Sequence, residues 1–474
     1  MVWALFLVRG AFYCTMMPLW EGFDEYAHFA RFSQGALPSM NTAMTREVER
    51  TFSLLPMPDQ LAWIPGVNIY PKWWKQDHSA DVREARNIPP AEAHEPSKQS
   101  FQSYESQQGP LYYWLLWPLM QLAGGWNILD RVLLARLLSL LIASAAIPFV
   151  RLAGGPGVGL GAACFLAVSP MFAVNASRVA NDCLAVSLVA LLLVLLGARR
   201  INGWYVGIVL GLALLTKAYA LTLIPAIALL LWRRSLLTLA VSFAIAGWWY
   251  LRNILLTGRL TGWEDDAALS SVVRSLPMVP WLHAAGSVFK TALWFGGWSF
   301  LTARPWMYNA LLVILAVAIA SGWKAASRWK ASWLIVAFFL AGMVYDVGAE
   351  FVTHNVSAAP GWYLWSVGGA FALLIAAGAG RWMAVVCALL CIFDLYSSQF
   401  IMLPYYAGFA AHGRSFAAIS QWPKAVTRLG VPWPLWVAFL AAGPAIVATL
   451  IANHEVSTAA AASRFDRAHR PTGE

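Results

Sequence analysis

Apolar runs of membrane-spanning length recur along the chain, and they constrain its fold more than any other feature. Of the 474 residues, 59% are apolar and only 12% are charged, and the mean hydropathy is +0.59. These values lie far outside the range of soluble domains. The sequence therefore predicts an all-α polytopic membrane protein, because apolar runs of this length form transmembrane helices.

Twelve spans are expected to cross the membrane. They are residues 2–17, 132–150, 158–174, 184–196, a hairpin of two spans over 204–231, and then 236–250, 307–322, 332–348, 362–379, 383–399 and 432–451. The apolar run 111–122 is excluded, because as a helix it covers roughly 18 Å of a hydrocarbon core of about 30 Å. This topology places the Arg and Lys clusters between spans, and both termini, in the cytoplasm, as the positive-inside rule requires.

The chain is expected to form one transmembrane domain, residues 1–452, with two outer loops. The first outer loop covers residues 20–108 and the second covers residues 257–289. The polar, Ala-rich tail 453–474 is predicted to be a disordered cytoplasmic segment. The net charge is +10, but the basic residues cluster between apolar runs. This is the bias of cytoplasmic loops, so nucleic acid is not implied as a partner.

The cysteines and histidines indicate neither a disulfide framework nor a histidine metal site. The five cysteines all lie in or beside apolar runs, which makes disulfides between them unfavoured. The eight histidines show no paired metal-ligand spacing. Any metal would therefore have to be held by carboxylates.

A stretch directly after the first span, residues 18–28, gathers acids at the membrane surface. Asp24 and Glu25 are adjacent, and His28 lies four residues after Asp24, so Asp24 and His28 share one face of a short helix. One interpretation is that these acids only stabilise the start of a helix. The other is that an acid, a second acid and an imidazole form part of an active site.

Several short motifs follow in a fixed order along the chain. They are Asp24-Glu25-x-x-His28, Pro110-Leu111-Tyr112-Tyr113, Asn181-Asp182 before a span, the segment Gly211 to Lys217, and Tyr250-x-Arg252-Asn253 at the end of a span. Taken together, the sequence resembles the polytopic glycosyltransferases of the C superfamily, especially the bacterial branch that is similar to protein mannosyltransferases. Two departures are visible. Gly109 stands where the family has a proline, and Gly361-Trp362-Tyr363-Leu364 stands where the family often has Gly-Arg-Tyr-Leu.

The resemblance implies a catalytic base after the first span and no metal cofactor, with a divalent cation held by carboxylates as the alternative. Transfer from a polyprenyl-phosphate sugar needs one carboxylate to take the proton of the acceptor hydroxyl, and this attack inverts the anomeric centre. Asp24 is the predicted base. Glu25 is a second acceptor contact, although Glu25 could equally be the base.

The resemblance also implies cations for the donor phosphate and polar or aromatic groups for the sugar and the acceptor. Lys217, Arg252 and Arg178 are the predicted phosphate ligands, because a fixed charge in a dry site stabilises a leaving phosphate. The predicted acceptor and sugar contacts are His28, Tyr112, Asp182 and Trp362. The alternatives are that Lys217 snorkels at a helix end, that Arg252 is an interfacial anchor, and that Asp182 only pairs with Arg178.

These observations predict an enzyme that moves a sugar from a polyprenyl-phosphate donor to a glycan, lipid or protein acceptor. It would lie in the plasma membrane with its active site facing the periplasm or the cell exterior. Two alternatives stay open: a transporter or flippase of lipid-linked glycans, and an inactive relative that acts as a scaffold. Neither the sugar nor the acceptor follows from the sequence.

Overall fold

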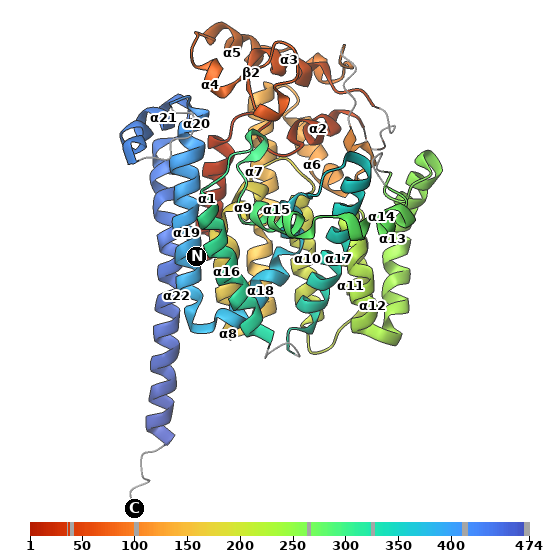
Figure 1. Ribbon diagram of the computed structural model, residues 1–474, viewed down its shortest axis with the longest axis vertical. Helices are drawn as coiled ribbons and strands as arrows, with labels where there is room; N and C mark the ends of the chain where they lie inside the picture. The colour runs from red at the N-terminus through yellow and green to blue at the C-terminus, as the bar shows by residue number, and fades with distance from the viewer. Residues whose placement is uncertain are drawn as a thin grey trace, which may run out of the picture.

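The fold is a bundle of long helices with a cap of short elements at one end (Figure 1). The structure is a computed structural model that describes residues 1–35, 37, 42–98, 104–262, 267–323, 328–409 and 416–468. Within these residues, six stretches are long and apolar enough to cross a membrane. They are Ile128–Val168, Ala218–Thr257, Pro305–Gly322, Lys330–His354, Gly361–Tyr406 and Trp433–Asn453. The predicted all-α polytopic fold is confirmed.

Three of these stretches each contain a pair of helices. The pairs are α7 (Ile128–Ser144) with α8 (Ala146–Val168), α12 (Leu223–Leu231) with α13 (Ser235–Thr257), and α18 (Gly368–Ala379) with α19 (Met383–Tyr396). The other bundle helices are α16 (Pro305–Gly322), α17 (Lys330–His354), α22 (Trp433–Ala468) and the shorter apolar helices α1 (Val2–Met16), α10 (Asp182–Leu196) and α11 (Gly203–Leu214). Each predicted span overlaps one or two of these helices.

The chain reverses inside α8, between the second and third predicted spans. Gly155 has φ +64° and ψ −164°, a conformation that only glycine adopts readily, and Pro156 follows it. A Cβ atom on Gly159 would lie 2.1 Å from the Arg151 carbonyl oxygen, so the two arms meet closely at this turn. The sequence placed the same break between residues 150 and 158.

The cap is formed mainly by the first predicted outer loop (Figure 1, top). Its elements are α2 (Glu25–Ala30), α3 (Arg46–Leu54), α4 (Tyr70–Trp73), α5 (Ser79–Arg86) and two short parallel strands, β1 (Pro56–Met57) and β2 (Asn68–Ile69). Arg50 joins α3 to Glu84 and Glu92 by hydrogen-bonded ion pairs. A buried ion pair between Glu47 and Arg131 joins α3 to α7. The cap is thereby fixed to the bundle.

Shorter helices connect the bundle elements near the cap and in the second outer loop. They are α6 (Leu111–Leu122), α9 (Pro170–Ala176), α14 (Leu269–Ser275), α15 (Trp281–Leu293), α20 (Leu403–Tyr406) and α21 (Trp422–Arg428). As predicted, α6 is too short to rank among the candidate spans.

The structure describes part of the predicted tail, residues 453–474. The backbone of α22 is helical as far as Ala468, and residues 469–474 lie outside the described residues. The Ala-rich composition of this segment agrees with a helical backbone, because alanine has the highest helix propensity. The disorder of the tail stays a prediction.

Candidate active site

A cavity of about 450 Å³ lies between the cap and the bundle. It is lined by the start of α2, the segment before α6, the turn between α11 and α12, the C-terminal part of α13 and the face of α17, together with Thr261 and Tyr363. The titratable residues on its walls are Asp24, Tyr104, Glu105, Lys217, Tyr219, Tyr250, Tyr345, Asp346 and Tyr363. The cavity therefore holds Asp24 and Lys217 together, as the sequence predicted.

Asp24 occupies an uncommon backbone position at the start of α2. Its φ of 56° and ψ of 15° lie in the left-handed region, which few residues other than glycine, asparagine and aspartate adopt. The Tyr104 hydroxyl donates a hydrogen bond of 2.5 Å to Asp24 Oδ1. Burial raises the pKa of Asp24 above its ordinary value, while the Tyr104 hydrogen bond and the charges of Arg178 and Lys217 oppose this shift. A raised pKa suits a carboxylate that must accept a proton.

Arg136 fixes the chain just before Asp24. Its guanidinium donates hydrogen bonds to the carbonyl oxygens of Cys14, Met17 and Pro18, at 3.1, 2.5 and 2.7 Å. These carbonyls belong to the end of α1, where no helical partner remains for them. The same guanidinium binds both oxygens of Glu25. The turn that carries Asp24 is thus held from both sides.

Glu25 does not line the cavity. It is fully buried, and besides Arg136 its Oε1 accepts a hydrogen bond from the Val179 N–H at 3.1 Å. A carboxylate with both oxygens bound to a buried guanidinium has no free position for a substrate. Its location therefore gives no support to the predicted catalytic role of Glu25, and we leave Glu25 out of the proposed mechanism.

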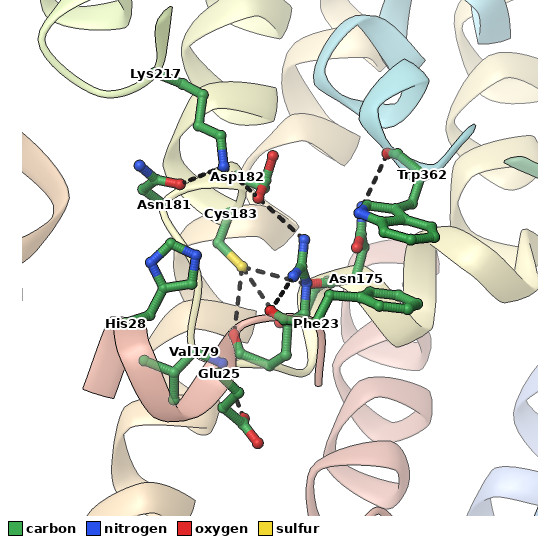
Figure 2. A network of polar contacts seen from close by, with 12 residues as sticks. Phe23, Glu25, His28, Asn175, Val179, Asn181, Asp182, Cys183, Lys217 and Trp362 are labelled. Atoms are coloured by element: carbon green, nitrogen blue, oxygen red, sulfur yellow. Dashed lines mark hydrogen bonds and ion pairs between the residues drawn. The ribbon is translucent and has the colours of Figure 1, made fainter. Parts of the chain in front are cut away.

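Lys217 lies in the turn after α11, and its ammonium is buried. Nζ donates hydrogen bonds to Asn181 Oδ1 at 2.9 Å and to Asp182 Oδ2 at 3.1 Å (Figure 2). It also lies 5.1 Å from the centroid of the Tyr219 ring and 5.9 Å from that of Tyr363, within range of cation–π attraction. The ammonium group of Lys217 is therefore held in place on the cavity wall and does not extend into water.

Arg178 shares Asp182 with Lys217. Its Nη2 lies 3.0 Å from Asp182 Oδ2, and its Nη1 donates a hydrogen bond to the Phe23 carbonyl oxygen. Two cations around one carboxylate give this cluster one positive charge in excess, and of its three charged residues only Lys217 lines the cavity. A phosphate monoanion or dianion would be attracted to such a site.

Gly109, the first departure from the family pattern, lies against the Lys217 turn. A Cβ atom there would be 2.1 Å from the Leu215 carbonyl oxygen, and the N–H of Leu111 donates a hydrogen bond to the same oxygen. The neighbouring Gln108 Oε1 accepts a hydrogen bond from Asn181 at 3.2 Å. The segment before α6 is therefore part of the support of Lys217.

Glu105 is a cavity residue that the sequence analysis did not single out. Its Oε2 is buried, has no hydrogen-bond partner among the described residues, and lies 3.6 Å from His28 Nδ1. Burial raises the pKa of Glu105 to about 8, with Lys217 acting against the shift and Asp24 adding to it. Its place in the motif just before Gly109 was the signal available in the sequence.

His28 is buried behind this cavity wall. Its Nδ1 lies 2.6 Å from the Tyr113 hydroxyl oxygen. Burial, together with the charges of Lys217 and Arg178, lowers the pKa of His28 well below its ordinary value. The imidazole is therefore neutral at physiological pH, and its contact with an acceptor stays a prediction.

The remaining predicted contacts lie away from the cavity walls. The Tyr112 hydroxyl is hydrogen-bonded to Ser139 at 2.6 Å in the interior. The Trp362 ring stacks on Phe23 at 3.8 Å between centroids, so the aromatic side chain that replaces the family's arginine belongs to a packed aromatic cluster. Arg252 lies over the Trp249 ring at 4.6 Å. The structure does not bring these three residues to the substrate space.

No group of three His, Cys, Asp or Glu residues that could hold a metal ion occurs among the described residues. The expectation that catalysis needs no metal stays a prediction.

Residues 107–251 match the family model described as dolichyl-phosphate-mannose-protein mannosyltransferase. The match confirms the resemblance to the glycosyltransferase C superfamily. It includes Gln108, Lys217 and Asp182, and it supports, in general terms, glycosyl transfer from a lipid-phosphate sugar. No curated protein matches the chain in sequence.

Two solved structures are similar to the chain at a low level. ArnT from Cupriavidus metallidurans in the apo state has 16% sequence identity and a TM-score of 0.41, with 90% of this chain and 75% of that chain covered. The same protein bound to undecaprenyl phosphate has 17% identity and a TM-score of 0.40, with 74% and 67% covered.

Proposed function

We propose that this protein transfers a sugar from a polyprenyl-phosphate donor to an acceptor hydroxyl at the outer face of the plasma membrane. One observation carries the proposal: Asp24 and Lys217, distant in sequence, line the same cavity. A base and an anion-binding charge in one cavity are the minimum that such a transfer requires. The match of residues 107–251 to the mannosyltransferase family supports the same class of reaction.

In the proposed reaction, Asp24 takes the proton from the acceptor hydroxyl as its oxygen attacks the anomeric carbon. The bond between that carbon and the phosphate oxygen breaks, and its electron pair leaves with the polyprenyl phosphate. The charges of Lys217 and Arg178 stabilise this leaving group, so no protonation of it is needed. Attack from the opposite face of the sugar inverts the anomeric configuration.

Comparison of two variants in cells tests the proposal. Asp24→Asn removes the base, whereas Asp59→Asn is a matched control, because Asp59 also accepts a hydrogen bond from a tyrosine, Tyr405 at 2.7 Å, in the same cap. Envelope glycans and lipids from a strain that lacks the chain are compared by mass spectrometry with those from strains that carry the native chain or either variant. We expect one sugar to be missing with no chain and with Asp24→Asn, and present with Asp59→Asn.

Two results would contradict the proposal. If the Asp24→Asn variant restores the missing sugar to the native level, Asp24 is not the base. If absence of the chain changes no glycan or lipid-linked sugar while it changes the distribution of a lipid-linked glycan across the membrane, the protein is a flippase instead.

A further inference from the structure

Asp346 is a half-buried acidic residue on the cavity wall. Its Oδ2 is buried and has no hydrogen-bond partner among the described residues. Asp182 and Asp394 each lie 3.0 Å from an arginine, Arg178 and Arg9, whereas Asp346 forms no ion pair within the described part of the chain. A buried carboxyl oxygen without a hydrogen-bond partner on a membrane-spanning helix is costly. A purely structural role gives no reason for that cost.

The helical periodicity of α17 places Asp346 on the face of the helix that lines the cavity. Phe339, Gly342, Met343 and Asp346 follow the spacing of one helical face, and all four line the cavity. Gly342 lets α17 approach closely, since a Cβ atom there would lie 2.6 Å from Thr222 Cγ2. Because Thr222 belongs to the segment directly after Lys217, the contact fixes Asp346 relative to the predicted phosphate ligand.

Two tyrosine rings line the same cavity as Asp346. The centroids of Tyr219 and Tyr363 are 4.6 Å apart, both rings flank the Lys217 ammonium, and both are within electrostatic range of Asp346. An aromatic face packs against the C–H groups of a sugar ring, and a carboxylate accepts hydrogen bonds from its hydroxyls. These groups together have the chemistry of a carbohydrate subsite.

We propose that Asp346 accepts hydrogen bonds from hydroxyl groups of the donor sugar and so helps to determine which sugar the enzyme takes. The inference rests on the proposed function. In this arrangement Lys217 binds the phosphate of the donor, and the anomeric carbon faces Asp24. The other hydroxyl groups of the sugar then face the part of the cavity wall that α17 forms. The subsite would take a sugar with unmodified hydroxyls, because an acylated or deoxygenated position would leave the carboxylate unpaired again.

A binding experiment separates the sugar contact from the phosphate contact. The full-length chain in lipid nanodiscs is loaded with radiolabelled undecaprenyl phosphate, which is then displaced by unlabelled undecaprenyl phosphate, undecaprenyl-phosphoglucose or undecaprenyl-phosphomannose. We expect at least one sugar-bearing lipid to bind the native chain about tenfold more tightly than undecaprenyl phosphate. Asp346→Asn should remove this advantage and leave the binding of undecaprenyl phosphate within about twofold of native.

Glu350→Gln is the matched control, because Glu350 lies one turn further along α17, pairs with His354 and does not line the cavity. It should keep the advantage of the sugar-bearing lipid. Three results would overturn the inference: the Asp346→Asn variant keeps the advantage, the native chain shows none, or the variant loses undecaprenyl phosphate as well. Failure of the proposed function is read from a different measurement, since the Asp24→Asn variant would then restore the missing sugar to the native level.

Discussion

Glu25 and Arg136 form a two-point ion pair in the interior, with Nε 2.7 Å from Oε1 and Nη2 2.6 Å from Oε2. The neighbouring residue in sequence, Asp24, faces the cavity instead. Two adjacent acids thus have separate tasks. Glu25 stabilises the segment that leads into α2, whereas the carboxyl group of Asp24 is available for catalysis.

The first prediction concerns stability. Glu25→Gln leaves the Arg136 charge without a counter-ion in the interior, and breaking a buried ion pair in this way costs about 3–5 kcal/mol. We expect a clear fall in the apparent melting temperature in detergent, with sugar transfer per folded molecule retained. Asp24→Asn is the control and should melt within a few degrees of the native protein. If Glu25→Gln melts like the native protein but abolishes transfer, Glu25 is the base.

The second prediction concerns the pH dependence of transfer. Tyr104 donates its hydroxyl hydrogen to Asp24, and this bond lowers the pKa of a carboxyl that burial raises. Tyr104→Phe should therefore raise the pKa of Asp24 further. Because the base must be ionised, the acidic limb of the profile of kcat/KM against pH should move to higher pH, by about one unit or less. A shift to lower pH, or none, would contradict the assignment of Asp24.

The third prediction concerns the donor. Lys217→Met removes the ammonium but leaves Asp182 paired with Arg178, so the variant should fold. Binding of undecaprenyl phosphate in nanodiscs should weaken by about tenfold or more, because a charge-assisted contact to phosphate is lost. Lys290→Met changes a lysine of α15 that does not line the cavity and should bind like the native chain. Equal binding by both variants would remove Lys217 from the phosphate site.

The fold was largely predictable because hydropathy is a local property of the chain. Each apolar run must satisfy its backbone hydrogen bonds internally, so length and composition determine the helix. Composition was less informative about the tail, since the backbone of the Ala-rich segment after Asn453 continues as helix to Ala468. Local helix propensity accounts for that backbone conformation, and the disorder of the tail stays a prediction.

The site was only partly predictable, because neighbours in space decide what a side chain does. The order of the motifs was enough to place Asp24 and Lys217 together. It could not distinguish Asp24 from Glu25, since consecutive helical residues point in different directions and the position of Arg136 depends on packing. Asp346 carried one signal in the sequence, an acid within an apolar run. Only the three-dimensional structure shows that its Oδ2 has no hydrogen-bond partner among the described residues and that the residue lines the cavity.

The last prediction concerns stability against pH and rests on Glu21, which lies in the cap outside the cavity. Its Oε2 accepts hydrogen bonds from the Ser299 hydroxyl at 2.9 Å and from Tyr70 at 3.1 Å, and its Oε1 accepts one from the Ser299 N–H. Burial raises the pKa of Glu21 to about 8, from an ordinary value near 4.5. The folded protein therefore binds a proton that the unfolded chain has released between these two pH values.

The sign of the effect follows from this difference in bound protons. Stability from Glu21 is fully present below pH 4.5, falls as pH rises toward 8, and is lost above it. The apparent melting temperature of the native protein should fall over this range. Glu21→Gln should make the fall less steep, because an amide does not titrate. A native slope that Glu21→Gln fails to reduce would show that Glu21 is ionised in the folded protein.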